Sequence, residues 1–141
     1  MRDIDTIIVH SSDSSFGNAL VIDEWHKLNG WDMIGYHYVI CNGCDEKGEY
    51  LGYKDGAIES GRGLEKVGAH AKGFNSKSIG ICLVSDGTYT TMQMLRLKIL
   101  ISELMLKFGI SKDKVIGHRE LEGVTKSCPE NLDMDKLRGE L

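Results

Sequence analysis

The sequence predicts an α/β fold in which helices flank one central mixed β-sheet, with residues 1–141 forming a single domain. Two observations support this class. Short runs of β-branched and aromatic residues alternate along the chain with segments of helical periodicity. One of these runs, residues 78–84, is almost continuously apolar, as in a strand buried on both faces. A chain of 141 residues suffices for one hydrophobic core, and no repeat or linker divides it.

The beginning of the chain predicts a strand followed by a helix. Residues 4–9 form a short β-branched run, and His10 lies at its C-terminal end. After a polar loop, Val21, Trp25 and Leu28 recur at the spacing of one helix face. This spacing predicts an amphipathic helix.

A hairpin and an irregular segment follow. Residues 36–41 and 49–53 have the composition of strands, and Gly43 and Gly48 bracket the turn between them. Asn42-Gly43 is in addition a strong hairpin-turn signal. Residues 56–73 are rich in glycine and predict an irregular stretch. Such stretches within compact domains tend to be functional.

The second half begins with the buried strand at residues 78–84 and continues into a helix. Thr90 and Gln93 fit a capping box, and Gly109 supplies a left-handed stop, so the helix runs to about Phe108. Its polar residues, Gln93 among them, are few. This predicts a narrow polar face on a well-buried helix.

The last part of the chain predicts a short strand over residues 114–117, which delivers His118, and a short helix over residues 133–141. His10 and His118 thus each follow a strand. One edge of the sheet can present both side chains together.

Charge and the lengths of the apolar runs argue against nucleic-acid and membrane partners. Lys and Arg number 17 against 21 Asp and Glu, and no dense basic run exists, so a nucleic-acid partner has no support. No apolar run reaches the roughly 20 residues that span a bilayer, so membrane insertion is not expected. The N-terminus lacks the pattern of a secretory signal, which predicts a protein held in the cytoplasm until release, or a sequence without its leader.

A zinc site is one possible use of the histidines and cysteines. A catalytic zinc keeps three nitrogen or sulfur ligands from the protein and leaves the fourth position to water. Cys128 lies ten residues beyond His118, in a loop that can fold back toward His10. Spacing alone leaves many other combinations open.

Six short blocks occur in order along the chain: Val9-His10-Ser11, Trp25-His26 with Gly30-Trp31, Gly35-Tyr36-His37-Tyr38, Gly68-Ala69-His70-Ala71-Lys72-Gly73-Phe74-Asn75, Ser78-Ile79-Gly80-Ile81, and Gly117-His118-Arg119-Glu120 with Lys126-Ser127-Cys128-Pro129. Together they resemble the zinc-dependent N-acetylmuramoyl-L-alanine amidase family, which includes the T-odd phage lysozymes and the animal peptidoglycan recognition proteins. The resemblance covers nearly the whole chain and is closest to the phage enzymes.

The resemblance implies a role for each matching residue. His10, His118 and Cys128 match the zinc ligands. Tyr36 matches a tyrosine that orients the attacking water or passes its proton to the leaving amine. Lys126 matches a lysine that stabilises the oxyanion formed when the lactyl carbonyl of muramic acid is attacked.

Other residues have a structural interpretation beside a functional one. His70 and Asn75, in the glycine-rich segment, either contact substrate or hold the loop. Strand alternation puts Tyr36 and Tyr38 on one face and His37 on the other, which makes His37 structural. His26 on the first helix is also expected to be structural.

The remaining cysteines have no catalytic interpretation. Cys82 lies in the apolar strand and is expected in the core. Cys41 and Cys44 form a C-x-x-C pair without matching metal ligands, and are expected to be a reduced pair or an opportunistic disulfide.

The function implied by the resemblance is hydrolysis of the amide between N-acetylmuramic acid and L-alanine in peptidoglycan, as in a phage or prophage endolysin that acts as a monomer. The alternative is a peptidoglycan-binding module without catalysis. The presence of Cys128, Tyr36 and Lys126 favours the enzyme. A regulatory contact with a phage RNA polymerase is disfavoured, because such a role would require a longer tail before His10.

Overall fold

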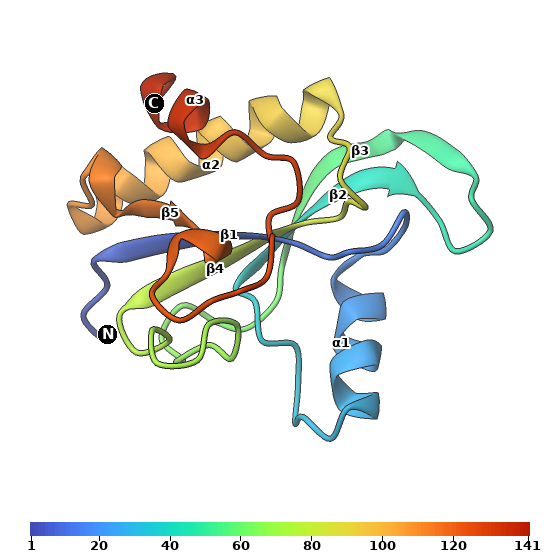
Figure 1. Ribbon diagram of the computed structural model, residues 1–141. Helices are drawn as coiled ribbons and strands as arrows, with labels where there is room; N and C mark the ends of the chain where they lie inside the picture. Colours follow the sequence, from blue (N-terminus) through green and yellow to red (C-terminus); the bar gives the residue numbers. More distant parts are fainter.

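The computed structural model describes residues 1–141 and contains one five-stranded sheet (Figure 1). Across the sheet the strands follow the order β3-β2-β4-β1-β5. Only β2 and β3 pair antiparallel; β2, β4, β1 and β5 are parallel neighbours. The strands are β1 (Thr6–Ser11), β2 (Tyr38–Cys44), β3 (Tyr50–Ser60), β4 (Ser78–Leu83) and β5 (Val115–Gly117). The prediction of a mixed sheet flanked by helices is confirmed.

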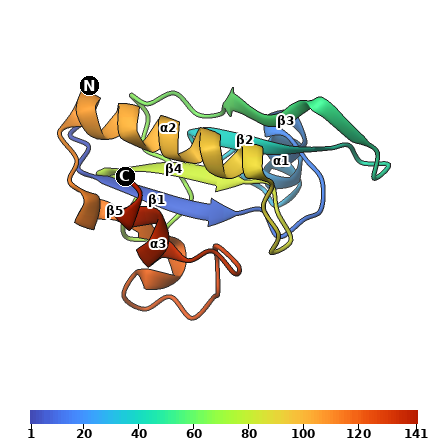
Figure 2. The ribbon, with the colours of Figure 1, turned by 90° about the horizontal axis from the view of Figure 1, so that it is seen from above.

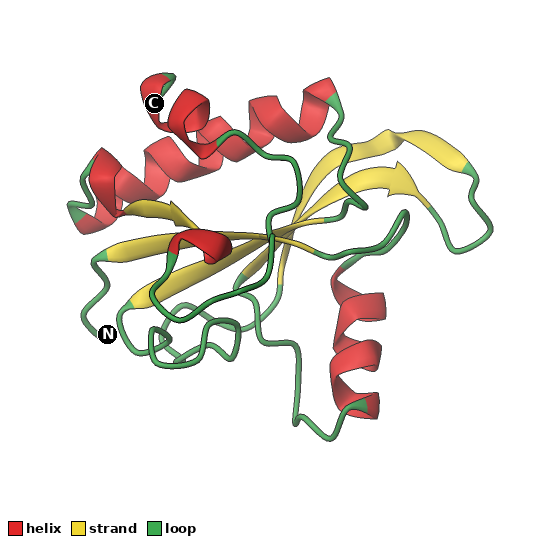
Figure 3. Ribbon diagram, in the orientation of Figure 1, coloured by secondary structure: helices red, strands yellow, loops and turns green.

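Helices cover both faces of this sheet (Figures 2 and 3). One face packs against α2 (Thr91–Phe108), and the opposite face packs against α1 (Ala19–Leu28). The short helix α3 (Met134–Gly139) lies beside β5. Two 3₁₀ turns, Lys112–Lys114 and His118–Glu120, flank β5. No helix is both long and apolar enough to cross a membrane.

The core confirms β4 as the central buried strand. All of its residues are buried, because β1 and β2 pair on either side and helices cover its two faces. Its alternating side chains divide between two apolar clusters: Ile79, Ile81 and Leu83 pack toward α2, while Cys82 packs toward α1. The core position predicted for Cys82 is therefore confirmed.

The helix α2 has the predicted ends but not the predicted burial. Thr90 and Gln93 form the capping box, and Gly109 adopts the left-handed conformation, with φ of 66°. Gln93 is fully buried rather than on a solvated face, and its side-chain amide donates to two main-chain carbonyls. Leu95 and Leu106 are instead exposed, because only one face of the helix meets the sheet.

The hairpin turn predicted between Gly43 and Gly48 is confirmed, whereas the helix face predicted for Leu28 is wrong. Leu28 is 85% exposed, and the buried residue of α1 is Ile22. Asn42-Gly43 lies within β2, at a shift of register, and the hairpin turns at Asp45–Gly48. The amide of Asn42 explains this, since it donates to the Ser15 carbonyl and accepts from the Cys44 N–H.

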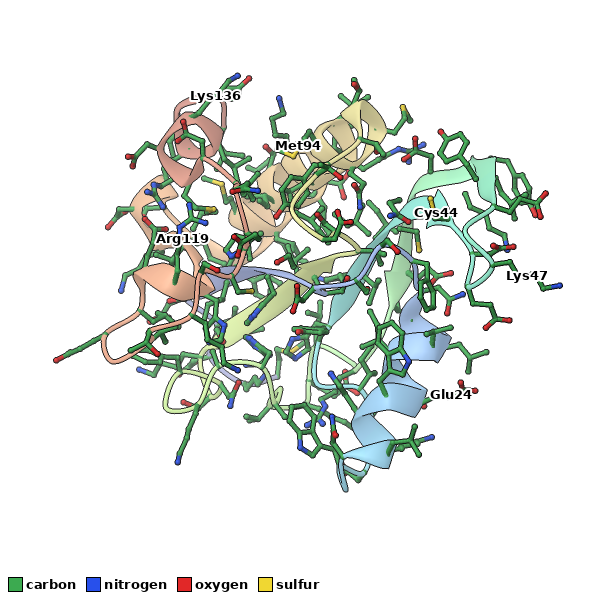
Figure 4. All side chains as sticks on the ribbon, turned by 45° about the vertical axis from the view of Figure 1, so that its right-hand side comes forward. Glu24, Cys44, Lys47, Met94, Arg119 and Lys136 are labelled. Atoms are coloured by element: carbon green, nitrogen blue, oxygen red, sulfur yellow. The ribbon has the colours of Figure 1, made fainter.

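The hairpin strand β3 extends well beyond its predicted end. It runs to Ser60, so the first residues of the predicted irregular segment are strand. The irregular part is the loop of residues 61–77 (Figure 3). At the hairpin tip the side chain of Lys47 projects away from the molecule (Figure 4).

Candidate metal centre and active site

Three predicted ligands come together where β1 and β5 end. His10 belongs to β1, His118 begins the 3₁₀ turn after β5, and Cys128 follows in the next loop. Because β1 and β5 are parallel neighbours, their carboxyl ends lie at the same edge of the sheet. One donor atom from each of the three residues lies within 4.8 Å of the others.

The ring of His10 has its two nitrogens in different surroundings. It is 1% exposed, and its Nδ1 lies 3.9 Å from the Cys128 Sγ. Its Nε2 lies 2.8 Å from Nδ1 of His70. The centroids of the His10 and His118 rings are 4.6 Å apart. Burial lowers the pKa of both His10 and His118, which favours the neutral imidazole that binds a metal.

Cys128 accepts hydrogen bonds at both its side chain and its main chain. The Ser11 N–H donates to its Sγ over 3.2 Å, and the Arg119 N–H donates to its carbonyl over 2.6 Å. The guanidinium of Arg119, labelled in Figure 4, also donates to the carbonyls of Pro129 and Leu132. Burial raises the pKa of the thiol, while the Ser11 donors and the charge of Lys126 oppose that rise.

These three residues line an open cavity of about 550 Å³. Tyr36, Lys126 and His70 line the same cavity, together with Trp31 from the loop after α1. The Tyr36 ring lies 5.0 Å from that of His10, and burial raises its pKa, so its hydroxyl is protonated at neutral pH. The cavity therefore combines soft donors, a phenol and a flexible cation.

The predicted alternation of Tyr36 and Tyr38 is wrong. Pairing of β2 begins only at Tyr38, so Tyr36 lies outside the regular strand and is not bound to its alternation. Tyr38 packs toward α2, whereas Tyr36 packs in the cluster toward α1. His37 is buried, accepts from the Gly80 N–H and contacts the Lys66 carbonyl, as expected for a structural histidine.

His70 and Asn75, predicted either to contact substrate or to hold the loop, make internal contacts. His70 lines the cavity, but both of its ring nitrogens have protein partners, His10 and Ser78. Burial lowers the pKa of His70 to about 3. Asn75 accepts the main-chain N–H groups of His70 and Ala71 and so holds the turn of this loop.

Sequence reasoning missed several of these supporting contacts. Arg119 stands next to His118 in a matching block, and this position could have indicated a role at the site. The contact of Ser11 with Cys128 spans 117 residues and that of His70 with His10 spans 60, so neither leaves a local sequence pattern. Cys41 and Cys44 are free thiols outside the cavity, as the reduced-pair interpretation expected.

Comparison with known proteins identifies the family. A model described as N-acetylmuramoyl-L-alanine amidase matches residues 1–131. This chain belongs to that amidase family. The resemblance inferred from the six sequence blocks is thereby confirmed.

Individual amidases and endolysins are similar over much of their length. The endolysin of Escherichia phage T7 is 33% identical over 136 residues, which cover 89% of this chain and 80% of that protein. The endolysin of Klebsiella phage KP32 is 33% identical over 77% of this chain and 66% of its own length. The structure of the amidase LysC from Clostridium intestinale superposes with a TM-score of 0.82 at 26% identity, covering 99% of this chain and 85% of that one.

Proposed function

We propose that this protein is a zinc-dependent N-acetylmuramoyl-L-alanine amidase of the endolysin type. Its substrate is peptidoglycan, and it hydrolyses the amide between N-acetylmuramic acid and the first L-alanine of the stem peptide. The observation that carries the proposal is the convergence of His10, His118 and Cys128 on one open cavity that Tyr36 and Lys126 also line. Residues 1–141 are proposed to form one amidase domain.

The donor set fits zinc. Two imidazoles and one thiol are the ligands that zinc and other thiophilic ions prefer, whereas magnesium and calcium prefer oxygen. Three protein donors would hold the ion and leave its fourth position to water or substrate. Bound there, zinc would polarise the scissile carbonyl and supply an acidic water.

The surrounding residues supply proton transfer and charge. Tyr36 lines the cavity with its ring 5.0 Å from that of His10, and its hydroxyl is protonated, so we propose it as the donor to the departing amine. Lys126 lines the cavity two residues before Cys128, and a cation there would stabilise negative charge on the attacked carbonyl oxygen. The neutral rings of His10 and His118 retain lone pairs for the metal.

The biological setting follows from the relatives. Phage endolysins act on the bacterial cell wall, and we propose the same destination here, with the protein held in the cytoplasm until lysis. We also propose that it acts as a monomer, because one chain supplies every residue of the cavity.

The experiment is digestion of purified peptidoglycan with the native protein, Cys128→Ala and Cys44→Ala, each stripped of metal and then assayed with and without zinc. Cys44→Ala is the matched control, since that thiol lies outside the cavity. Mass spectrometry should detect stem peptides with a free N-terminal L-alanine from the zinc-loaded native and control proteins, and none from Cys128→Ala. Tight binding of native protein to uncut peptidoglycan would instead indicate a recognition module.

A further inference from the structure

A line of hydrogen bonds leads from His10 into the loop of residues 61–77. The Nε2 of His10 lies 2.8 Å from Nδ1 of His70, and the Nε2 of His70 lies 3.3 Å from the Ser78 Oγ. The Ser78 hydroxyl in turn donates to the Phe74 carbonyl over 2.7 Å. The line begins at a predicted metal ligand and ends on the main chain of the loop.

The donor of each hydrogen bond can be assigned by starting from the bond at the end of the line, between Ser78 and Phe74. Ser78 has one hydroxyl proton and gives it to a carbonyl, so it can only accept from His70. A neutral imidazole has one N–H, which places the proton of His70 on Nε2 and leaves Nδ1 as an acceptor. His10 must then donate through Nε2. Its lone pair remains on Nδ1, the nitrogen that faces Cys128.

Two glycines make room for the His70 ring. A Cβ built on Gly68 would lie 2.6 Å from Cδ2 of His70, and a Cβ on Gly80 would lie equally close to that ring. The Asn75 side chain holds the main chain of His70 from the other direction. The orientation of the ring is thus set by packing as well as by hydrogen bonds.

We propose that His70 is a positioning residue, which fixes His10 in the tautomer whose Nδ1 binds the metal. This inference rests on the proposed zinc site and gives His70 a role different from substrate contact. A partner for the free nitrogen of a ligating histidine orients the ring and selects its tautomer. Here the partner is an uncharged imidazole rather than a carboxylate. A zinc ion with one thiolate would therefore keep a net positive charge to act on the substrate carbonyl.

The test compares substitutions that keep or remove the acceptor. In His70→Asn the side-chain oxygen can occupy the place of Nδ1, whereas His70→Gln puts its amide near the place of Nε2, and His70→Ala removes both. Zinc affinity of each metal-stripped protein would be measured by competition with a chromophoric chelator. The tautomer of His10 would be read by long-range ¹H–¹⁵N NMR correlation.

We expect zinc affinity to fall by about 10- to 100-fold in His70→Ala and His70→Gln, and to stay within a few-fold of native in His70→Asn. Native His10 should carry its proton on Nε2. Equal zinc affinity in all four proteins, or a native His10 protonated on Nδ1, would overturn the assignment. Thermal unfolding of the metal-stripped variants separates a loss of folding from a loss of positioning.

Neither readout uses peptidoglycan, so the two proposals can fail separately. Zinc affinities in the expected order, in a protein that leaves peptidoglycan intact, would support the role of His70 and refute the amidase activity. Full amidase activity of the native protein, with zinc affinity unchanged in His70→Ala, would support the amidase activity and refute the role of His70.

Discussion

Tyr36 is the residue of the cavity lining that we propose as proton donor. Replacing Tyr36 with Phe removes its hydroxyl and keeps the ring that packs 5.0 Å from His10. We expect kcat on a soluble muropeptide to fall by about 100-fold or more, since general acid catalysis contributes on that scale. Zinc affinity should remain within a few-fold of native. An unchanged kcat would assign proton donation to another group.

The ammonium of Lys126 is the second group whose contribution can be isolated. We expect Lys126→Met to lower kcat by about 100-fold, because loss of one oxyanion donor has an effect of this order. Lys126→Arg retains the positive charge and should recover part of the rate. Comparable losses in both variants would show that the position of the amine, rather than its charge, decides the rate.

At the residue scale, matched sequence blocks predicted which side chains meet, but not how they are supported. His10, His118 and Cys128 were proposed together because each lies in a recognisable block, and the structure brings them to one cavity. The contact between His10 and His70 joins β1 to a loop 60 residues further along the chain. Nothing in the local sequence of either residue encodes that contact, so the sequence leaves His70 open between substrate contact and loop support.

Among the elements, α2 depends on one buried side chain. The Gln93 amide donates to the carbonyls of Ile40 and Val84, while its oxygen accepts the Thr90 N–H. Gln93→Met keeps the approximate length of the side chain but leaves both carbonyls without this donor. We expect the free energy of unfolding to fall by about 2 to 4 kcal/mol in urea titrations.

A control for this loss lies on the outer face of the same helix. Leu106 is 88% exposed, and Leu106→Ala should change the free energy of unfolding by no more than about 0.5 kcal/mol. The Ile40 carbonyl also accepts the Val84 N–H, so if Gln93→Met were as stable as this control, the Val84 carbonyl would have to bind water or another donor.

Capping signals in the sequence predict where a helix begins and ends better than the pattern of apolar residues predicts which of its faces is buried. The capping box and Gly109 act through contacts within a few residues, so the boundaries of α2 could be predicted. Which face of a helix is buried depends on where the sheet lies. For this reason the exposure of Leu28 and the burial of Gln93 were both missed.

For the whole molecule, all five histidines share one property that predicts how stability depends on pH. Burial is the first cause that lowers the pKa of each from 6.5. The unfolded chain therefore binds more protons than the folded one once the pH falls below about 6.5. The contribution of the neutral histidines to the free energy of unfolding should be fully present above that pH. Below it, the free energy of unfolding should decline by about 1.4 kcal/mol per pH unit for each additional proton that the unfolded chain binds.

Urea unfolding of the metal-free protein between pH 8 and pH 5 measures this dependence. His37→Gln is the informative variant, because His37 is buried and is not a predicted metal ligand. Its slope should be shallower than the native slope by at most one proton. A native stability that is flat from pH 8 to pH 5 would contradict the prediction.

The strand order also has a consequence for how quickly the chain folds. β1 is the first strand in the sequence, yet it lies between β4 and β5. Thr6 pairs with Ser78 and Ile7 with Val115, at sequence separations of 72 and 108 residues. Such pairings raise contact order, because a long stretch of chain must be closed before the contact stabilises anything. We therefore expect slow folding for an α/β protein, with the cluster of His10, His118 and Cys128 among the last parts to assemble.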